Sequence, residues 1–411
     1  MTPRHGQAAG RPALAARMGG LSPSAIGSVL RLGDRSDVIS LAGGLPAREA
    51  SECPEAAAVL GPILGEHPTG LDYGDTNGLP TLREWIAGYL RADLGADSEP
   101  DDVVVVHGAQ QGIDLVCKAL LDPGDVVVVD RPSYIGALQV FRLFQAEVRA
   151  VPLADDPELG ELTEALAHGL RPRLLYTVPN YSNPSGAVLT ASQRRRLAGL
   201  AERYGFLLVE DDPYRELWLT DERPSAPALT ALTDRSVHLG SFSKILFPGC
   251  RIGYLTGPPA VMSAITLVRQ AADLGNSELL QRMVLALLTQ DGFLDRRLDR
   301  LRALYRERRD ALASALSRHL PGAAFRPPEG GFFLWATLGP GLDSALLLPS
   351  ALKHGVSYVP GAAFYPSRPE PSTARLAFSC LPPEQAGEAA ARLARALGGA
   401  RADGPPEGGD A

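Results

Sequence analysis

The sequence is poor in cysteine and has no long apolar run. Its 411 residues include four cysteines, Cys53, Cys117, Cys250 and Cys380, which lie far apart and form no CxxC pair. A zinc centre or a disulfide framework is therefore not expected, and no metal site is predicted. No stretch approaches the roughly 18 uninterrupted apolar residues of a membrane span, and the first residues lack the apolar segment of a signal peptide. We therefore expect a soluble, cytoplasmic protein with no membrane partner.

The chain also lacks a strongly basic segment. Lys and Arg number 40 against 47 Asp and Glu, which gives a formal net charge of −7. The run Arg194-Arg195-Arg196 is typical of a solvated helix face, so no nucleic-acid partner is expected. The length exceeds that of one small core and favours two domains.

Short apolar runs alternate with helical segments through the middle of the chain. Strands are expected at 103–106, 126–129, 174–178, 206–209 and 237–239, and helices at 109–121, 135–144 and 190–204. Runs that are apolar on both faces predict a buried, mostly parallel sheet between helices. The predicted fold class is therefore α/β, with a large domain of this kind and a smaller α+β domain.

Composition and pattern changes predict the domain boundaries. Residues 1–20 and 401–411 are rich in Gly, Pro, Ala and charge and are expected to be disordered. Residues 21–60 are expected to form an arm that packs with the small domain, and residues 61–290 the large domain. The small domain is expected over 291–400, with a long charged helix at 296–319 and strands at 331–335 and 376–379.

Polar and aromatic residues follow each predicted strand. In such sheets, ligands bind beyond the carboxyl ends of the strands, where these residues converge. A purely structural sheet does not need them there. The residues at these strand ends are Gly108–Gln110, Tyr134, Asn180, Asn183, Glu210–Asp212, Ser241, Ser243 and Lys244.

A phosphate site is indicated where the segment Gly108-Ala109-Gln110 begins a helix. The first N–H groups of a helix bind anions, although every helix start offers them. Ser241, Ser243 and Arg251 add hydroxyls and a guanidinium for the same phosphate.

Lys244 and Asp211 are candidate catalytic residues. A partly desolvated lysine beside other cations has a lowered pKa and can form an imine. A lone lysine is more often exposed on the surface, but the flanking serines and Arg251 favour the reactive role. A carboxylate such as Asp211 can hold a pyridine nitrogen protonated, or can instead cap a helix or form a salt bridge.

Four further residues each have two interpretations. Tyr214 can hydrogen-bond a ring hydroxyl or simply belong to the core. Asn183 can hydrogen-bond the same hydroxyl or be part of an ordinary Asn-Pro turn. Tyr134 can stack on a ring or be core. Arg375 precedes the predicted strand at 376–379 and suits bidentate capture of a carboxylate, or a surface ion pair.

Ten segments, in order, resemble those of one family. The chain is similar to the fold-type I, class I/II pyridoxal-phosphate-dependent aminotransferases, and especially to the branch of 2-aminoadipate and kynurenine aminotransferases. The resemblance covers roughly residues 21–398, and ten segments in order are far more specific than any one of them. They are SLAGGLP (40–46), LDYGDTNGLPTLRE (71–84), HGAQQGIDL (107–115), RPSYIGALQVF (131–141), PNYSNPSG (179–186), VEDDPYREL (209–217), GSFSKILFPGCRIGY (240–254), PEGGFFLW (328–335), VPGAAFY (359–365) and RLAFS (375–379).

The resemblance implies the cofactor pyridoxal 5′-phosphate and a role for each matching residue. It implies that Lys244 is the Schiff-base lysine and later the proton shuttle, and that Asp211 is the partner of the pyridine nitrogen. Asn183 and Tyr214 would flank the ring hydroxyl, and Tyr134 would stack on the ring. The phosphate would be held by Ala109, Gln110, Ser241, Ser243 and Arg251.

The resemblance also implies a substrate site and a homodimer. Arg375 corresponds to the α-carboxylate clamp, and Gly43 and Gly44 to a mobile segment over the substrate. Tyr73 corresponds to the tyrosine that reaches the partner subunit's phosphate, so that the two subunits share their active sites.

The expected reaction is transfer of an amino group from an L-amino acid to a 2-oxo acid. Gly27 stands where dicarboxylate-using relatives tend to have an arginine, so a non-acidic or unusual side chain is expected, unless Arg31 or Arg48 substitutes. The composition, rich in Ala, Arg, Gly and Pro, suggests a role in specialised metabolism. Ala109 replaces a residue that usually carries a hydroxyl, which removes one phosphate contact. The alternatives are another reaction at the α-carbon on the same scaffold (β-elimination, decarboxylation, racemisation or oxidation) and a cofactor-bound regulator without turnover.

Overall fold

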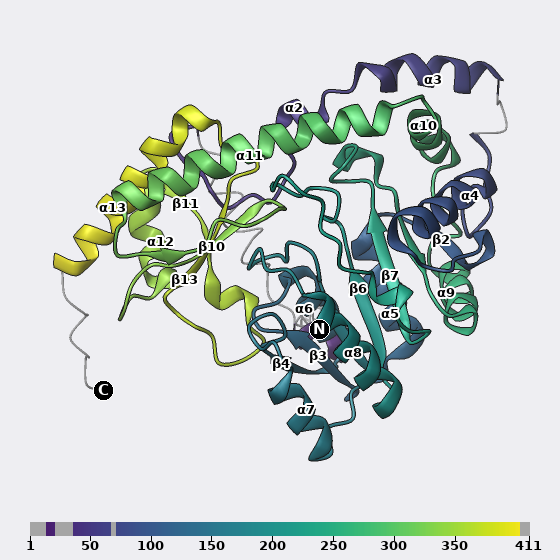
Figure 1. The fold of residues 1–411 in the computed structure, drawn as a ribbon, viewed down its shortest axis with the longest axis horizontal. Helices are drawn as coiled ribbons and strands as arrows, with labels where there is room; N and C mark the ends of the chain where they lie inside the picture. The colour runs from purple at the N-terminus through teal and green to yellow at the C-terminus, as the bar shows by residue number, and fades with distance from the viewer. Residues whose placement is uncertain (1–13, 21–35, 67–70, 403–411) are drawn as a thin grey trace, which may run out of the picture.

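A seven-stranded sheet forms the centre of the large domain. The computed structural model describes residues 14–20, 36–66 and 71–402 (Figure 1). The strand order is β2-β8-β7-β6-β5-β3-β4, and only β8 runs antiparallel to its neighbours. The strands are β2 (Val103–Val106), β3 (Val126–Asp130), β4 (Glu147–Val151), β5 (Leu174–Thr177), β6 (Leu207–Asp211), β7 (Ser236–Ser241) and β8 (Gly253–Thr256).

Helices cover both faces of this sheet, because alternate residues of its buried strands point to opposite sides. Val127 and Val129 pack in one cluster with α5 (Ala109–Leu120) and α6 (Ile135–Leu143). Val128 packs in the other cluster, with α7 (Gly160–Ala167) and α8 (Ala191–Tyr204). The remaining helices of this domain include α4 (Pro80–Tyr89), α9 (Pro259–Ala272) and α10 (Glu278–Leu288). The predicted α/β class with a mostly parallel sheet is confirmed.

The small domain is built on a second, antiparallel sheet with the order β12-β13-β10-β9. Its strands are β9 (Ala324–Phe325), β10 (Phe333–Thr337), β12 (Val359–Pro360) and β13 (Thr373–Ala377). The helices α11 (Phe293–His319), α12 (Ser344–Lys353) and α13 (Ala386–Ala402) pack with it, and Figure 1 shows α11 running across the top of both domains. Arg375 lies inside β13 and does not precede it, so the expected start of this strand was wrong.

The N-terminal arm divides between the two domains. As expected, β1 (Ile39–Ser40) pairs with β11 (Val356–Ser357) of the small domain. After the short α2 (Arg48–Ser51), however, α3 (Pro54–Glu66) packs on α10 of the large domain. Residues 16–20, expected to be disordered, form a 3-10 helix against α6. Residues 401 and 402, also expected to be disordered, belong to helix α13 (Ala386–Ala402), and the predictions for 1–13, 21–35 and 403–411 concern residues outside the described part.

One arginine that its charge would place at the surface is instead buried and holds neighbouring loops by hydrogen bonds. Arg194 was expected on a solvated face, yet it is fully buried in α8 and donates to the carbonyl oxygens of Leu189 and Pro179 and to Asn180 Oδ1. Arg195 and Arg196 are exposed, as expected.

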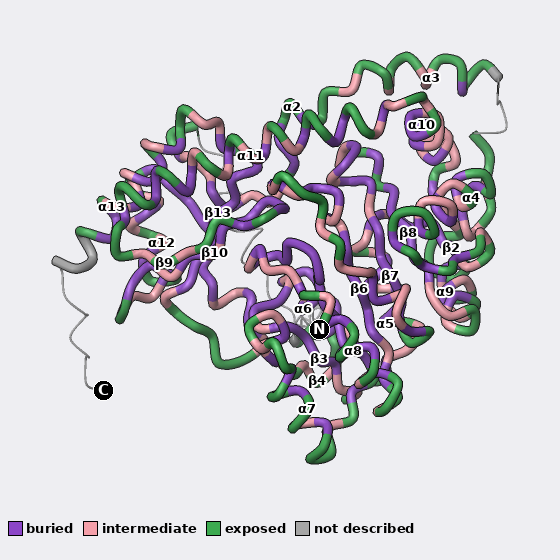
Figure 2. The backbone as a smooth tube through the Cα atoms, viewed as in Figure 1, coloured by how far each residue is buried: buried purple, intermediate pink, exposed green. Residues whose placement is uncertain are grey.

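In the described part of the chain, no helix is long and apolar enough to cross a membrane. Figure 2 shows how the buried residues concentrate in the strands of both sheets.

Arg297 ties the long helix α11 to the turn at the end of β7. Its Nε donates to the carbonyl oxygen of Ile245 at 2.8 Å, and its guanidinium also donates to the carbonyls of Leu246 and Ala50. Because it is buried, its loss leaves three acceptors without a donor.

We predict that Arg297→Met lowers the free energy of unfolding by on the order of 3 kcal/mol, since each unsatisfied buried carbonyl costs about 1–3 kcal/mol. Urea denaturation of the apoprotein, followed by circular dichroism, measures the loss. The matched control is Arg300→Met on the same helix, where an exposed arginine donates to Glu52 O at 3.3 Å. A loss no larger than the control's would contradict the prediction.

Candidate active site

A cavity of about 280 Å³ lies at the carboxyl edge of the large sheet, where the small domain meets it. The large domain supplies the strand-end residues, and the small domain supplies Phe333 and Arg375. Of the residues to which the family resemblance assigns a role, all but Gly43 and Tyr73 line it; Asn180, Glu210 and Asp212, also expected at this edge of the sheet, do not. The full lining is Gly44, Leu45, Gly108, Ala109, Gln110, Tyr134, Val178, Asn183, Asp211, Pro213, Tyr214, Ser241, Ser243, Lys244, Arg251, Phe333 and Arg375.

Lys244 stands in the turn that follows β7, with its amine in the cavity. Its Nζ is 3.5 Å from the carbonyl oxygen of Gly44. Burial, together with the positive charges of Arg251 and Arg375, lowers its pKa to about 8. A much larger fraction of this amine is therefore neutral, and nucleophilic, at physiological pH than for an ordinary lysine.

Asp211 ends β6 and faces the cavity with one free oxygen. Its Oδ2 accepts a hydrogen bond from the hydroxyl of Tyr176 at 2.6 Å, whereas its buried Oδ1 has no partner. Burial raises the pKa of this carboxyl to about 6; the Tyr176 bond opposes the rise and the charge of Asp212 adds to it. A buried oxygen without a donor fits a cationic N–H group of a ligand. Tyr176 was not expected from the sequence.

Two tyrosines and an asparagine shape the middle of the cavity. Tyr134 precedes α6 and donates its hydroxyl to Gln110 Oε1 at 3.1 Å. Tyr214 is buried against Phe332 and Phe333, and its side chain is hydrogen-bonded to that of Asn183. Burial raises the pKa of both tyrosines, that of Tyr134 to about 12, so both stay protonated near neutral pH.

The start of α5, the serines after β7 and Arg251 surround one end of the cavity. Gly108 precedes α5 with φ +78°, and a Cβ there would lie 3.1 Å from Arg251 NH2. Ser243 Oγ is buried without a partner. Arg251 has φ +48°, a left-handed conformation that is strained for a non-glycine residue. Free helix N–H groups, an unpaired hydroxyl and a guanidinium form a site that fits a phosphate.

Arg375 reaches the cavity from β13 of the small domain. Its NH1 donates to Asn183 Oδ1 at 2.8 Å and its NH2 to Ala42 O at 2.7 Å, while Nε is buried without a partner. Its Cζ lies 4.3 Å from the ring centre of Phe333 and 5.1 Å from that of Phe364. Burial lowers its pKa to about 10, so it remains a cation near neutral pH. Such an arginine can still donate to a carboxylate.

The remaining candidates lie outside the lining. Gly43 is half-buried beside Gly44, where a Cβ would come within 2.6 Å of the Phe333 ring. Tyr73 is 94% exposed. Arg48 is exposed at the start of α2, and the positions Gly27 and Arg31 lie outside the described residues.

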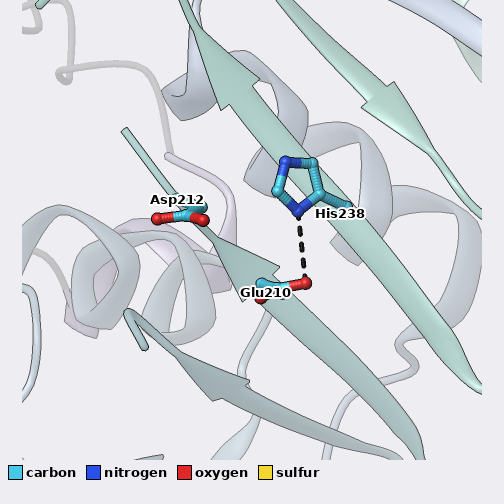
Figure 3. Close-up of side chains that lie close together, drawn as sticks. All are labelled: Glu210, Asp212 and His238. Carbon is cyan, nitrogen blue, oxygen red and sulfur yellow. Dashed lines mark hydrogen bonds and ion pairs between the residues drawn. The ribbon is translucent and has the colours of Figure 1, made fainter. Parts of the chain in front are cut away.

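Glu210, Asp212 and His238 form a buried acidic cluster on the other face of the sheet (Figure 3). Their ligand atoms lie within 4.8 Å of one another, a spacing that a metal ion can span. Protein groups already bind most of these atoms: Glu210 Oε2 lies 3.2 Å from His238 Nδ1 and accepts from Leu229 N, and both oxygens of Asp212 accept from Asn180 Nδ2. Glu210 Oε1 has no hydrogen-bond partner but lies 3.9 Å from the guanidinium of Arg194. We therefore describe the cluster as a structural network.

Comparison with known proteins decides the family. The model of the family "Aminotransferase class I and II" matches residues 36–393. The chain belongs to the class I and II aminotransferases. It is 36% identical to "Aromatic-amino-acid aminotransferase 1" of Thermococcus litoralis, over 92% of each chain, and 36% identical to "2-aminoadipate transaminase" of Thermus thermophilus, over 93% of this chain and 95% of that one. Among solved structures, the α-aminoadipate aminotransferase of Thermus thermophilus, complexed with N-(5′-phosphopyridoxyl)-L-leucine, superposes with a TM-score of 0.86, covering 94% of this chain and 97% of that one at 36% identity.

Pyridoxal phosphate is the cofactor of this aminotransferase, and the geometry fits it. The anion site at α5 matches the phosphate, and the free Asp211 Oδ1 matches the ring nitrogen. The lysine amine lies in the same cavity. The structure thus brings together the donors that the family resemblance implied.

The lowered pKa of Lys244 leads to a pH prediction for the apoprotein. The neutral amine attacks an aldehyde, so the rate of reaction with pyridoxal should rise through pH 8 and level off above about pH 9, whereas an ordinary lysine continues to gain rate up to pH 10.4. Stopped-flow absorbance at a series of pH values measures it. Lys244→Ala, which retains Lys118 and Lys353, supplies the background. A rate that is still rising steeply at pH 10 would refute the lowered pKa.

Proposed function

We propose that this aminotransferase moves the amino group of an L-amino acid with a non-acidic side chain to a 2-oxo acid, with Lys244, Asp211 and Arg375 as the principal residues. The observation that carries the proposal is the convergence of three groups on one cavity: an amine with a lowered pKa, a carboxylate with a free buried oxygen, and a buried guanidinium with a free N–H. Each group fits a different part of the reaction.

In this proposal the cofactor supplies the electron sink, and the protein controls protons and orientation. Asp211 holds the ring nitrogen protonated through its free Oδ1. Lys244, once displaced, removes the α-proton of the amino acid and returns it to the cofactor side, because an amine with a pKa near 8 exchanges protons readily at neutral pH.

Orientation comes from the two ends of the cavity. Arg375 and Asn183, which are hydrogen-bonded to each other in the cavity, would bind the α-carboxylate and so orient the α-proton toward Lys244. Tyr134 would lie against the ring, Asn183 and Tyr214 would lie beside its hydroxyl, and Ala109, Gln110, Ser241, Ser243 and Arg251, which line the same cavity, would hold the phosphate.

The lining favours a substrate with a neutral side chain. Among the described residues, Arg251, Arg375 and Lys244 are the cations that line the cavity, and each already has a role in the proposal. Leu45, Val178 and Phe333 offer apolar contacts. Relatives named for aromatic amino acids are consistent with this assignment, although others are named for 2-aminoadipate.

We predict that the purified protein, reconstituted with pyridoxal phosphate, absorbs in the visible and that an aromatic or aliphatic L-amino acid moves the band to the near-ultraviolet. Glutamate and 2-aminoadipate should act at least about tenfold less efficiently, because an unpaired side-chain carboxylate in an apolar site costs at least about 1.4 kcal/mol. Rapid-scan absorbance over a panel of amino acids measures this.

Lys244→Ala is the control for the same experiment. It should still bind the cofactor but lose the amino-acid-dependent shift by at least about 10³-fold, since the proton acceptor is absent. A band that no amino acid shifts would point to another reaction at the α-carbon or to a regulator. Equal rates with acidic and neutral donors would refute the substrate assignment only.

We further propose a homodimer in which Tyr73 completes the phosphate site of the partner subunit. Tyr73 lies outside this chain's own cavity and is 94% exposed, so its hydroxyl is free to reach another subunit. A tyrosine hydroxyl is a suitable donor to a phosphate.

A hybrid dimer tests the shared site. Tyr73→Ala should weaken cofactor binding about tenfold, the loss of one hydrogen bond to a charged group. When Tyr73→Ala and Lys244→Ala proteins are refolded together, the hybrid has one native site, with Lys244 from one subunit and Tyr73 from the other. Activity at limiting cofactor should therefore exceed that of either variant alone. Activity equal to the mean of the separate variants would contradict a shared site.

A further inference from the structure

Tyr176 lies behind Asp211 and outside the cavity lining. Its hydroxyl donates to Asp211 Oδ2 at 2.6 Å, and its ring is fully buried with an edge-to-face contact to Phe141 at 5.7 Å. It does not line the cavity that fits the cofactor. Its hydrogen bond therefore connects Tyr176 to the cavity through the carboxylate of Asp211.

The sheet register explains why the two side chains meet. β5 and β6 are parallel neighbours, with Tyr176 opposite Val209. Paired residues point to the same face, and Asp211, two residues after Val209, returns to that face. A tyrosine side chain is long enough to lean along the strand and reach the carboxylate at the strand end.

We propose that Tyr176 is a positioning residue, which fixes the Asp211 carboxylate with Oδ1 toward the cofactor nitrogen and keeps it ionised. The proposal rests on the proposed function of Asp211. With Oδ2 engaged by the hydroxyl, rotation of the carboxylate would break a short buried hydrogen bond, so Oδ1 is held free for the ligand. Donation to the charged form also stabilises the anion that must face a protonated ring nitrogen.

The groups around Asp211 leave Tyr176 as its direct hydrogen-bond donor among the described residues. Lys244 and His238 from β7 and its turn favour the anion by charge alone, and the neighbouring Asp212 disfavours it. Tyr134 and Tyr214 also lie near the carboxylate. Burial and the charge of Asp211 raise the pKa of Tyr176 well above 10, so it remains a donor throughout the working pH range.

Tyr176→Phe is the direct test, since it removes one oxygen and keeps the ring. The pKa of Asp211 should rise, and the ring nitrogen should lose part of its positive charge. The imine nitrogen that joins Lys244 to the cofactor should then accept a proton more readily, and the midpoint of the pH titration of cofactor absorbance should move up by about 0.5–1 unit. The dissociation constant of pyridoxal phosphate should rise roughly tenfold, and kcat should fall about 10- to 100-fold with little change in KM.

Tyr358→Phe is the matched control. It also removes a buried tyrosine hydroxyl, which donates to Ser344 O at 2.7 Å in the small domain, away from the cavity. Its loss of thermal stability should be similar, but the titration midpoint and the cofactor affinity should stay at the wild-type values. If Tyr176→Phe behaves like this control, Tyr176 only packs, and the proposal is wrong.

Asp211→Asn separates this inference from the proposed function. If that variant keeps the wild-type cofactor affinity and titration, the role of Asp211 itself is wrong. If it loses them, Tyr176→Phe added to Asp211→Asn should cost at most about twofold more in cofactor affinity, because no carboxylate remains to be positioned. An equal penalty in both backgrounds would show an independent structural effect and overturn the proposal.

Discussion

Three consecutive carboxylates are buried where β6 ends, and the site depends on how each one is neutralised. Glu210, Asp211 and Asp212 are all less than 10% exposed. Unpaired buried charges are very costly, so each must have a partner. Strand alternation turns the outer two to one face of the sheet and Asp211 to the other. The same run of acids therefore serves two separate purposes.

On the far face, protein groups hydrogen-bond to Glu210 Oε2 and to both oxygens of Asp212, whereas Glu210 Oε1 has only the charge of Arg194 nearby. Arg194 lies 3.9 Å from Glu210 Oε1, His238 contacts Oε2, and Asn180 holds Asp212. Arg194 also donates hydrogen bonds to Asn180 and to the carbonyl oxygen of Pro179, so the loop that carries Asn183 is connected to the same network. On the cavity face, Asp211 has one protein donor, Tyr176, and one open oxygen. Asp211 lines the cavity and its Oδ1 has no protein donor, which makes this oxygen available to a ligand.

Much of this arrangement was predictable from the sequence, because parallel strands bring their carboxyl ends to one edge. Lys244, Asp211 and Asn183 follow apolar runs and could be placed at that edge without a structure. The strand β4 was not predicted because exposed residues, Glu147 and Arg149, alternate with the half-buried Val148 and Ala150, so no apolar run marks it. Arg194 was wrongly predicted to be exposed because it is charged. It lies on the buried face of α8, three residues before Leu197.

Tyr176 was missed for a related reason. Inside an apolar strand, a tyrosine is indistinguishable from core until the register with the next strand is known. The contact of Arg375 with Asn183 has the same origin, since it joins residues 192 positions apart across two domains. Local patterns predict which residues reach the edge of the sheet, whereas the pairing of side chains behind that edge depends on register and domain packing.

The charge balance of the cavity explains why this edge selects anionic ligands. Lys244, Arg251 and Arg375 contribute three cationic groups against the single carboxylate of Asp211. Burial already disfavours two of these cations, lowering the pKa of Lys244 to about 8 and that of Arg375 to about 10. A phosphate at α5 and a carboxylate at Arg375 each bring negative charge that the protein does not supply. Binding of these groups therefore offsets the desolvation cost of the cations. Arg375 Nε, buried and unpaired in the free protein, is a donor available to such a carboxylate.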